Sequence, residues 1–127
     1  MKRILVIDDE PGVRDAFSDA LDDMAQVDTA ASGEEGLAKA DEATPDLIFL
    51  DLKMPGIDGV ETLRRLQQSA AGVPVFIVTA FHREFMDRLQ EAAQAGLLFN
   101  VLDKPLDSDQ IRVIARSVFE GPQAFEQ

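Results

Sequence analysis

A chain of 127 residues that is 46% hydrophobic fits one domain with a single packed core, and this composition excludes a disordered chain. The absence of cysteine excludes disulfides and thiolate metal sites, and a net charge of −12 argues against direct nucleic-acid binding because the surface repels phosphates. The first apolar run, Ile4–Ile7, is too short for a signal peptide or a membrane span, so we expect a cytoplasmic protein that does not associate with membranes.

Five short apolar runs follow one another along the chain, separated by stretches of helical periodicity. The runs are Lys2–Ile7, Gln26–Ala30, Asp46–Leu50, Val73–Thr79 and Leu97–Leu102. The first, third and fourth are nearly continuous in Ile, Val, Leu and Phe, which is typical of strands buried on both faces of a parallel sheet. The second run is more polar and suits an edge strand.

Apolar residues between these runs recur at spacings of three and four, which predicts helices with one face against the core. The predicted core-facing stripes are Val13, Phe17, Ala20, Leu21 and Met24; Val60, Leu63 and Leu66; Phe85, Leu89, Ala92 and Ala93; and Ile111, Ile114, Ala115 and Val118. The predicted boundary signals are Pro11, a capping box at Ser32–Glu35, an N-cap at Asp58, an N-cap at Asp107 or Ser108, and helix ends at Gly72 and Gly96.

These patterns predict an α/β domain of (βα)5 type with a parallel five-stranded sheet. We expect it to cover residues 1–120, with residues 121–127 as a tail or the start of a linker. We see no internal repeat and no low-complexity tract in the sequence.

Polar side chains stand at the carboxyl ends of four predicted strands. Asp8 and Asp9 follow the first strand, Asp51 the third, Thr79 ends the fourth, and Lys104 follows the fifth. Parallel strands end at one sheet edge, so we expect these residues to lie together. Two like charges about 4 Å apart cost about 4 kcal/mol at an effective dielectric near 20, so a lysine and a hard cation such as Mg²⁺ should compensate. A carboxylate nucleophile in such surroundings suits phosphoryl transfer.

The motifs at these positions match a known family. Asp8-Asp9-Glu10-Pro11, Asp51-Leu-Lys-Met-Pro-Gly-Ile-Asp-Gly59, Val78-Thr79-Ala80 and Lys104-Pro105 together resemble the receiver domain of two-component response regulators. The resemblance covers nearly the whole chain. It implies a doubly wound, flavodoxin-like fold with strand order 2-1-3-4-5 and helices on both faces of the sheet.

The same resemblance implies the chemistry of the site. Asp51 accepts a phosphoryl group from the phosphohistidine of a histidine kinase in a reaction that depends on Mg²⁺. For the metal, the resemblance implies direct ligation by Asp9 and Asp51, a contact of Asp8 through water, and ligation by the backbone carbonyl of Lys53.

Further expectations follow from the resemblance. Thr79 and Lys104 contact phosphoryl oxygens, and the Lys104–Pro105 bond is cis. The partners are a sensor histidine kinase or a histidine phosphotransfer protein and a downstream effector protein or domain, with a homodimer as an option on phosphorylation. The domain catalyses its own phosphorylation and autodephosphorylation, relays the signal by a conformational change of its surface, and transforms no metabolite.

Val101 departs from the usual receiver pattern, and Phe81 bears on the lifetime of the phosphoryl group. Receivers carry Tyr or Phe three residues before the lysine, but here Val101 stands there and Phe99 lies two residues earlier. We expect that either Phe99 takes over or coupling is weaker and differently routed, and that the segment Gly96–Lys104 contains a bulge because it is one residue longer than usual. Phe81 should hinder the hydrolytic water, which predicts slow autodephosphorylation.

Three alternatives share part of this pattern. A phosphatase like the haloacid dehalogenases would use Asp51 as nucleophile, but it would carry a second Asp where this chain has Lys53. A flavodoxin-like FMN-binding protein would need a Ser/Thr/Gly-rich loop where this chain has Asp8-Asp9-Glu10, whose charge repels the FMN phosphate. A degenerate receiver that is never phosphorylated is disfavoured because all five site residues are present.

Overall fold

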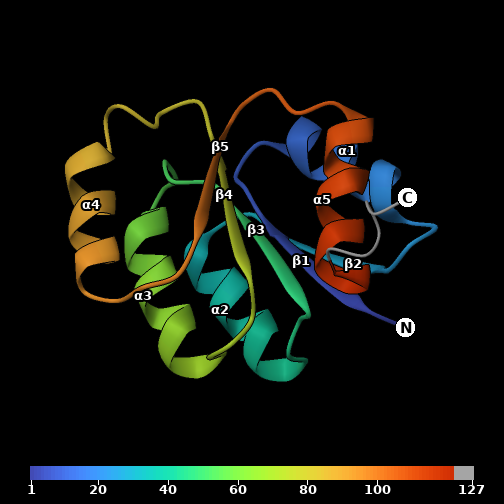
Figure 1. Ribbon diagram of the computed structural model, residues 1–127, viewed down its shortest axis with the longest axis horizontal. Coiled ribbons are helices and arrows are strands. Elements are labelled where there is room, and N and C mark those ends of the chain that lie inside the picture. The colour runs from blue at the N-terminus through green and yellow to red at the C-terminus, as the bar shows by residue number, and fades with distance from the viewer. Residues whose placement is uncertain (122–127) are drawn as a thin grey trace.

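The computed structural model describes residues 1–121, over which strands and helices alternate as predicted (Figure 1). The strands are β1 (Arg3–Ile7), β2 (Gln26–Ala30), β3 (Leu47–Leu50), β4 (Val75–Thr79) and β5 (Asn100–Asp103). The helices are α1 (Pro11–Leu21), α2 (Gly33–Glu42), α3 (Gly59–Ser69), α4 (Met86–Gln94) and α5 (Ser108–Glu120). No helix within residues 1–121 combines the length and the apolar character that a membrane crossing requires.

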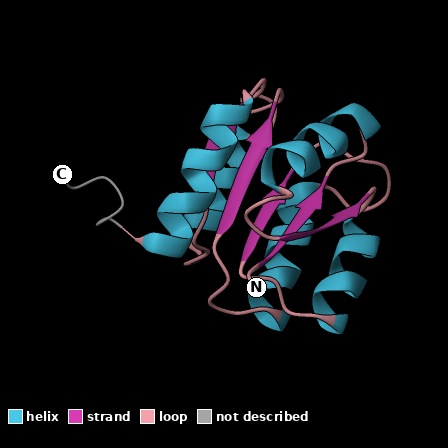
Figure 2. Ribbon diagram, turned by 90° about the vertical axis from the view of Figure 1, so that its right-hand side faces the viewer, coloured by secondary structure: helices cyan, strands magenta, loops and turns pink. Residues whose placement is uncertain are grey.

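The five strands form one parallel sheet in the order β2-β1-β3-β4-β5. Helices α2, α3 and α4 pack on one face of the sheet, and α1 and α5 pack on the other (Figures 1 and 2). The predicted doubly wound fold is therefore confirmed. Because all strands run in the same direction, their carboxyl ends lie along one edge of the sheet.

The core has two parts, one on each face of the sheet. Along β1, Leu5 and Ile7 belong to the part under α2, α3 and α4, whereas Ile4 and Val6 belong to the part under α1 and α5. Side chains of a strand alternate between faces, so a strand covered on both faces must be apolar at every position. This explains the nearly continuous apolar runs seen in the sequence.

The predicted fifth strand and fourth helix need correction. β5 begins at Asn100 instead of Leu97, and the side chain of Leu98 is 77% exposed in the loop before it. Pairing with β4 then runs without interruption to Asp103, so the bulge predicted for this segment is wrong for the strand. In α4, Ala93 is exposed because it falls one residue beyond the buried Ala92 and turns away from the sheet.

Helix starts agree with the capping signals, with one correction. Pro11 is the first residue of α1, and the carboxylates of Asp58 and Asp107 cap α3 and α5. The hydroxyl of Ser32 accepts a hydrogen bond from the N–H of Glu35 at 3.1 Å and caps α2. The predicted capping box there is incomplete, because the Glu35 carboxylate pairs with Lys39 at 3.4 Å.

Both predicted helix ends have the expected backbone. Gly72 and Gly96 follow α3 and α4 with φ of 88° and 91°, a conformation that glycine adopts without strain. α5 ends at Glu120, and residues 122–127 of the predicted tail lie outside the described residues.

A glycine lets the chain fold back against the end of β3. A Cβ added to Gly59 would lie 2.2 Å from the carbonyl oxygen of Asp51 and 2.6 Å from Cα of Leu52. Both are backbone atoms, so the clash is relieved only by moving the loop that carries Asp51. This close approach fixes the path of the chain directly after the sheet edge.

Gly59→Ala should therefore destabilise the fold, by about 1–3 kcal/mol as for other overpacked sites. Gly12→Ala is the matched control, because no described atom lies within 4 Å of a Cβ added there. The control should be neutral or stabilise α1 by up to about 1 kcal/mol. Urea denaturation curves of the two variants measure both effects, and equal midpoints would contradict the steric explanation.

Candidate functional site

Backbone hydrogen bonds place the predicted site residues at the sheet edge. The N–H of Asp51 donates to the carbonyl of Ile7 at 2.9 Å. The N–H of Asp8 donates to the carbonyl of Ala30, the last residue of β2, at 3.0 Å. The N–H of Lys104 donates to the carbonyl of Thr79 at 3.0 Å. Residues that are far apart in the sequence are thus joined strand to strand, directly beyond the last residues of the sheet.

Four carboxylates gather at this edge. One oxygen each of Asp8, Asp9, Glu10 and Asp51 lies within 4.8 Å of the others. Asp8 and Asp51 are 3% and 2% exposed, whereas Asp9 is half-buried and Glu10 is exposed. The structure confirms that the three predicted aspartates meet.

Glu10 also belongs to this cluster. In the sequence, its position directly before Pro11 favours a role at the start of a helix, with contact to a metal-bound water as the alternative, and Glu10 is indeed the N-cap residue of α1. Its side chain makes no capping hydrogen bond, however, and points to Lys104 instead. The signal available in the sequence was its position directly after Asp9.

The ammonium group of Lys104 lies among these carboxylates and is within hydrogen-bond distance of three of them. The distances are 2.8 Å to Asp8 Oδ2, 3.1 Å to Glu10 Oε1 and 3.2 Å to Asp51 Oδ2. The lysine side chain is 13% exposed. Its burial lowers the pKa of Lys104, but hydrogen bonds and attraction from Asp8, Asp51 and Glu10 outweigh this and leave the pKa raised. The lysine therefore stays charged.

One lysine does not fully compensate the buried acids. Burial raises the pKa of Asp8, and repulsion from Asp51 adds to this effect. Hydrogen bonds from Lys104 and from the N–H of Glu10 oppose the rise without cancelling it. Ionisation of Asp8 in the folded protein thus costs free energy, and a further positive charge at the site would reduce this cost.

The two oxygens of Asp51 have different partners. Oδ1 accepts the N–H of Leu52 at 2.8 Å, and Oδ2 faces Lys104. Thr79 is fully buried on the neighbouring strand, and its hydroxyl oxygen accepts the N–H of Phe81 at 3.0 Å. The hydroxyl hydrogen of Thr79 remains available for another acceptor.

The donor set fits a hard divalent cation. All four clustered groups offer carboxylate oxygens, which Mg²⁺ prefers, and within residues 1–121 no histidine or cysteine joins them. His82 lies apart from the cluster, with its Nδ1 3.6 Å from Asp103. The carboxylate chemistry and the raised pKa of Asp8 both agree with a bound cation. Ligation by the Lys53 carbonyl stays a prediction.

Residues 4–116 match the response regulator receiver domain family. The chain belongs to this family. It is 35% identical over 112 residues to sporulation initiation phosphotransferase F of Bacillus subtilis, which covers 87% of this chain and 88% of that protein. It is 41% identical over 102 residues to the response regulator GacA of Pseudomonas viridiflava, and this match covers 77% of the chain and 48% of GacA. The chain thus spans about half the length of that relative.

Solved receiver structures are similar in fold. The CheY-like receiver domain from Methanospirillum hungatei has a TM-score of 0.83 at 26% identity, with 98% of both chains covered. Vibrio cholerae CheY4 has a TM-score of 0.79 at 30% identity, with 94% of this chain and 99% of that chain covered. The phosphatase and flavodoxin alternatives belong to families other than the one that residues 4–116 match.

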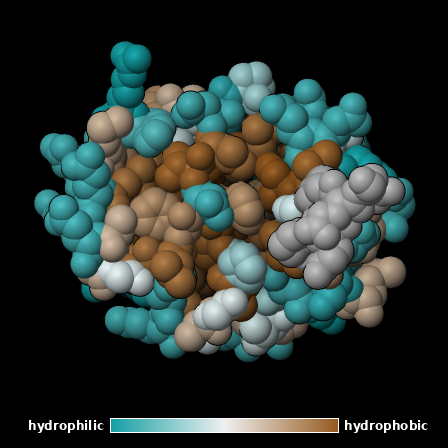
Figure 3. Space-filling view, in the orientation of Figure 1, coloured by the Kyte–Doolittle hydropathy of each residue, from teal (hydrophilic) through white to brown (hydrophobic). Residues whose placement is uncertain are grey.

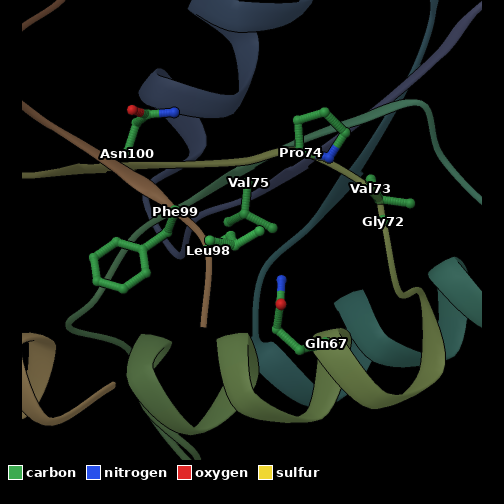
Figure 4. Close-up of a pocket in the computed structure, with 8 residues that line it drawn as sticks. All are labelled: Gln67, Gly72, Val73, Pro74, Val75, Leu98, Phe99 and Asn100. Carbon is green, nitrogen blue, oxygen red and sulfur yellow. The ribbon is translucent and has the colours of Figure 1, made fainter. Parts of the chain in front are cut away.

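The receiver domain differs from its expected pattern on β5. Phe99 precedes the strand and lines a pocket at the amino ends of β4 and β5, together with Pro74, Val75 and Leu98 (Figure 4). Thr79 is at the opposite end of β4, four residues after Val75, or about 13 Å along a strand. The structure therefore argues against Phe99 as a replacement for an aromatic residue at Val101, although both side chains pack against the same part of the core.

The last backbone expectation is met. The peptide bond between Lys104 and Pro105 is cis.

Proposed function

We propose that this receiver domain accepts a phosphoryl group on Asp51 from the phosphohistidine of a sensor histidine kinase or a histidine phosphotransfer protein. The observation that carries the proposal is the surroundings of Asp51. It is a buried carboxylate whose Oδ2 lies 3.2 Å from the Lys104 ammonium, and one of its oxygens lies within 4.8 Å of three other carboxylates. A carboxylate that only shaped the turn after β3 would not need an ammonium group and three further carboxylates beside it.

The transfer exchanges one bond for another. A carboxylate oxygen of Asp51 attacks the phosphorus, a P–O bond forms, and the P–N bond to the imidazole breaks. The imidazole leaves with the electron pair and takes up a proton. Lys104 keeps its positive charge beside the new acyl phosphate, and the Thr79 hydroxyl donates to a phosphoryl oxygen. In-line positioning and charge neutralisation are the main requirements of this chemistry.

We propose Mg²⁺ as the cofactor. Asp9 and Asp51 would ligate it directly, Asp8 would act through water, and the Lys53 carbonyl would complete the protein ligands. When bound, the ion supplies positive charge that neutralises the transferring phosphoryl group.

Surfaces near the site support the proposed partners. A groove of about 410 Å³ between α1 and α5 adjoins Lys104, and its apolar lining includes Val13, Ala16 and Leu106. An apolar helix that carries the phosphohistidine would fit there. On the side where β5 forms the sheet edge, hydrophobic side chains gather in the middle of the face, inside a hydrophilic border (Figure 3). We assign this face to an effector or, on phosphorylation, to a second copy.

We propose residues 1–120 as the receiver unit, acting as a signalling phosphoacceptor that turns over no metabolite. Lys53 occupies the position where an aspartyl-phosphate phosphatase would place its second Asp. The ammonium of Lys53 pairs with Glu84 at 3.5 Å, so this position holds a cation and offers no carboxylic acid to protonate a leaving group. Steady turnover of p-nitrophenyl phosphate would contradict this assignment.

Intact-mass spectrometry tests the proposed function. The chain is treated with acetyl phosphate and Mg²⁺, and the same mixture with EDTA is the control. We expect one phosphoryl group to be added with Mg²⁺ and none with EDTA, and peptide mapping should place it on Asp51. No adduct with Mg²⁺, or an adduct on another residue, would refute the proposal.

Phe81 should set the lifetime of the phosphoryl group. Its side chain is 36% exposed, and its ring centroid is 4.5 Å from the ammonium of Lys53 at the mouth of the site. Phe81→Ala opens this mouth to water and should shorten the half-life of the phosphorylated form by about two- to ten-fold, an effect of about 1 kcal/mol on the barrier. The decay of the adduct mass with time measures it. An unchanged or longer half-life would show that Phe81 does not shield the acyl phosphate.

A further inference from the structure

Two ion pairs join the segment after β3 to the start of α4. The ammonium of Lys53 lies 3.5 Å from Glu84 Oε2, and the guanidinium of Arg88 pairs with the carboxylate of Asp58. Aromatic rings support both cations, since Lys53 lies over Phe81 and Arg88 lies 5.9 Å from the ring of Phe85. We call the Lys53–Glu84 and Asp58–Arg88 pairs the clamp.

The clamp joins the phosphoacceptor segment to a weakly held helix. Lys53 follows Asp51 by two residues, whereas Glu84 and Arg88 flank the first residue of α4. α4 has nine residues, its N-cap Phe85 makes no side-chain capping bond, and two of its residues, Leu89 and Ala92, are buried. A helix with so few buried contacts belongs to the low-stability end of a fold, where weak surface interactions decide its position.

The edge strand offers little alternative coupling. The residues of β5 are Asn100, Val101, Leu102 and Asp103, so no aromatic ring lies within this strand beside Thr79. Met54 of the Asp51 segment belongs to the same buried cluster as Phe85 and Leu89, but its side chain is apolar. The charged side chains of this segment that pair with the start of α4 are Lys53 and Asp58, which makes the clamp a route by which a charge change at Asp51 can reach α4.

We propose that the clamp holds the start of α4 in the unphosphorylated receiver, and that a phosphoryl group on Asp51 releases it by drawing the ammonium of Lys53 away from Glu84. The inference rests on the proposed function, because it requires phosphorylation of Asp51. The acyl phosphate carries nearly two negative charges where the ionised Asp51 carboxylate carried one, so the site gains about one negative charge. Both Lys53 and Glu84 are about half exposed, so their pair is weak and yields to a stronger, more buried anion.

The expected size of the effect follows from the exposure of the pair. An exposed ion pair shifts an equilibrium by about two- to five-fold. Loss of the Lys53–Glu84 pair should therefore raise the opening of α4 by this factor without unfolding the domain. Release of α4 is therefore graded: phosphorylation shifts the population of open α4 and does not switch it completely.

Hydrogen exchange of the amides of residues 89–92 tests the clamp in the unphosphorylated chain. Glu84→Gln and Lys53→Gln should each raise exchange about two- to five-fold, and the double variant should exchange no faster than either single variant. Glu35→Gln is the matched control, because it removes a similarly exposed pair with Lys39 on α2. Unchanged exchange in both single variants, or additive effects in the double variant, would overturn the clamp.

The same measurement after treatment with acetyl phosphate and Mg²⁺ tests its release. With the adduct verified by intact mass, exchange of residues 89–92 should rise in the wild type, and Glu84→Gln should add nothing further. An equal effect of Glu84→Gln in both states would show that phosphorylation does not act through this pair. Failure to form any adduct would refute the proposed function, whereas the unphosphorylated comparison would still report on the clamp.

Discussion

Asp51→Asn should abolish formation of the phosphoryl adduct from acetyl phosphate and Mg²⁺. The carboxamide has no charged oxygen to attack phosphorus, and it removes one of the proposed metal ligands. The loss should be complete within the sensitivity of intact-mass spectrometry, at least about a hundred-fold. The reason is that the variant has no other group at this position that can act as the nucleophile. Asn is nearly isosteric with Asp, so the fold should persist.

Asp41→Asn is the matched control for this prediction. Asp41 is an exposed residue of α2 and is no member of the carboxylate cluster. The control should form the adduct as the wild type does. An adduct that persisted in the Asp51 variant would place the phosphoryl group on another residue, and would remove the basis of the proposed mechanism.

The fold was predictable because its signals are local and repeated. Continuous apolar runs predict strands covered on both faces, and spacings of three and four predict the helices between them. The boundary of β5 was not predictable in this way, because Leu97, Leu98 and Phe99 look like strand residues in the sequence. Pairing with β4 begins only at Asn100, and that register is set by tertiary contacts.

The site was predictable where topology alone decides position. Asp8, Asp51 and Lys104 each stand at a strand end, and a parallel sheet brings such ends together. The contact of Glu10 with Lys104 and the Lys53–Glu84 pair were not predictable, since they depend on how one loop lies beside another. A sequence shows that these side chains are charged, but the distance between two loops follows from packing of the whole domain.

The contrast between Asp8 and Lys104 shows what the site lacks without its metal. The lysine gains from its three acidic neighbours, and its pKa rises even though burial lowers it. Asp8 shares that lysine with two other acids, and its pKa stays raised because burial and Asp51 outweigh the help it receives. The fold thus carries an electrostatic cost at Asp8 that a bound cation would offset.

Asp8→Asn should consequently act in opposite directions on stability and on metal binding. In EDTA at pH 7 it removes a buried charge that is incompletely compensated, and it should stabilise the fold by about 1–2 kcal/mol, or several degrees in Tm. The wild type should gain about 2.7 kcal/mol at a free Mg²⁺ concentration about one hundred times its Kd, whereas the variant should gain much less. Thermal unfolding with EDTA and with Mg²⁺ measures both, and Asp41→Asn should change neither.

The pH dependence of this difference follows from the sign of the shift. An acid whose pKa is raised by folding is protonated more readily in the folded state, so its ionisation reduces stability as pH rises. Below the ordinary value of 3.8, Asp8 is protonated in both states and the advantage of Asp8→Asn in EDTA should vanish. The advantage should grow as pH rises through the raised pKa and stay constant above it. An advantage of the variant that grew as pH fell would have the opposite sign and would show that ionised Asp8 stabilises the metal-free fold.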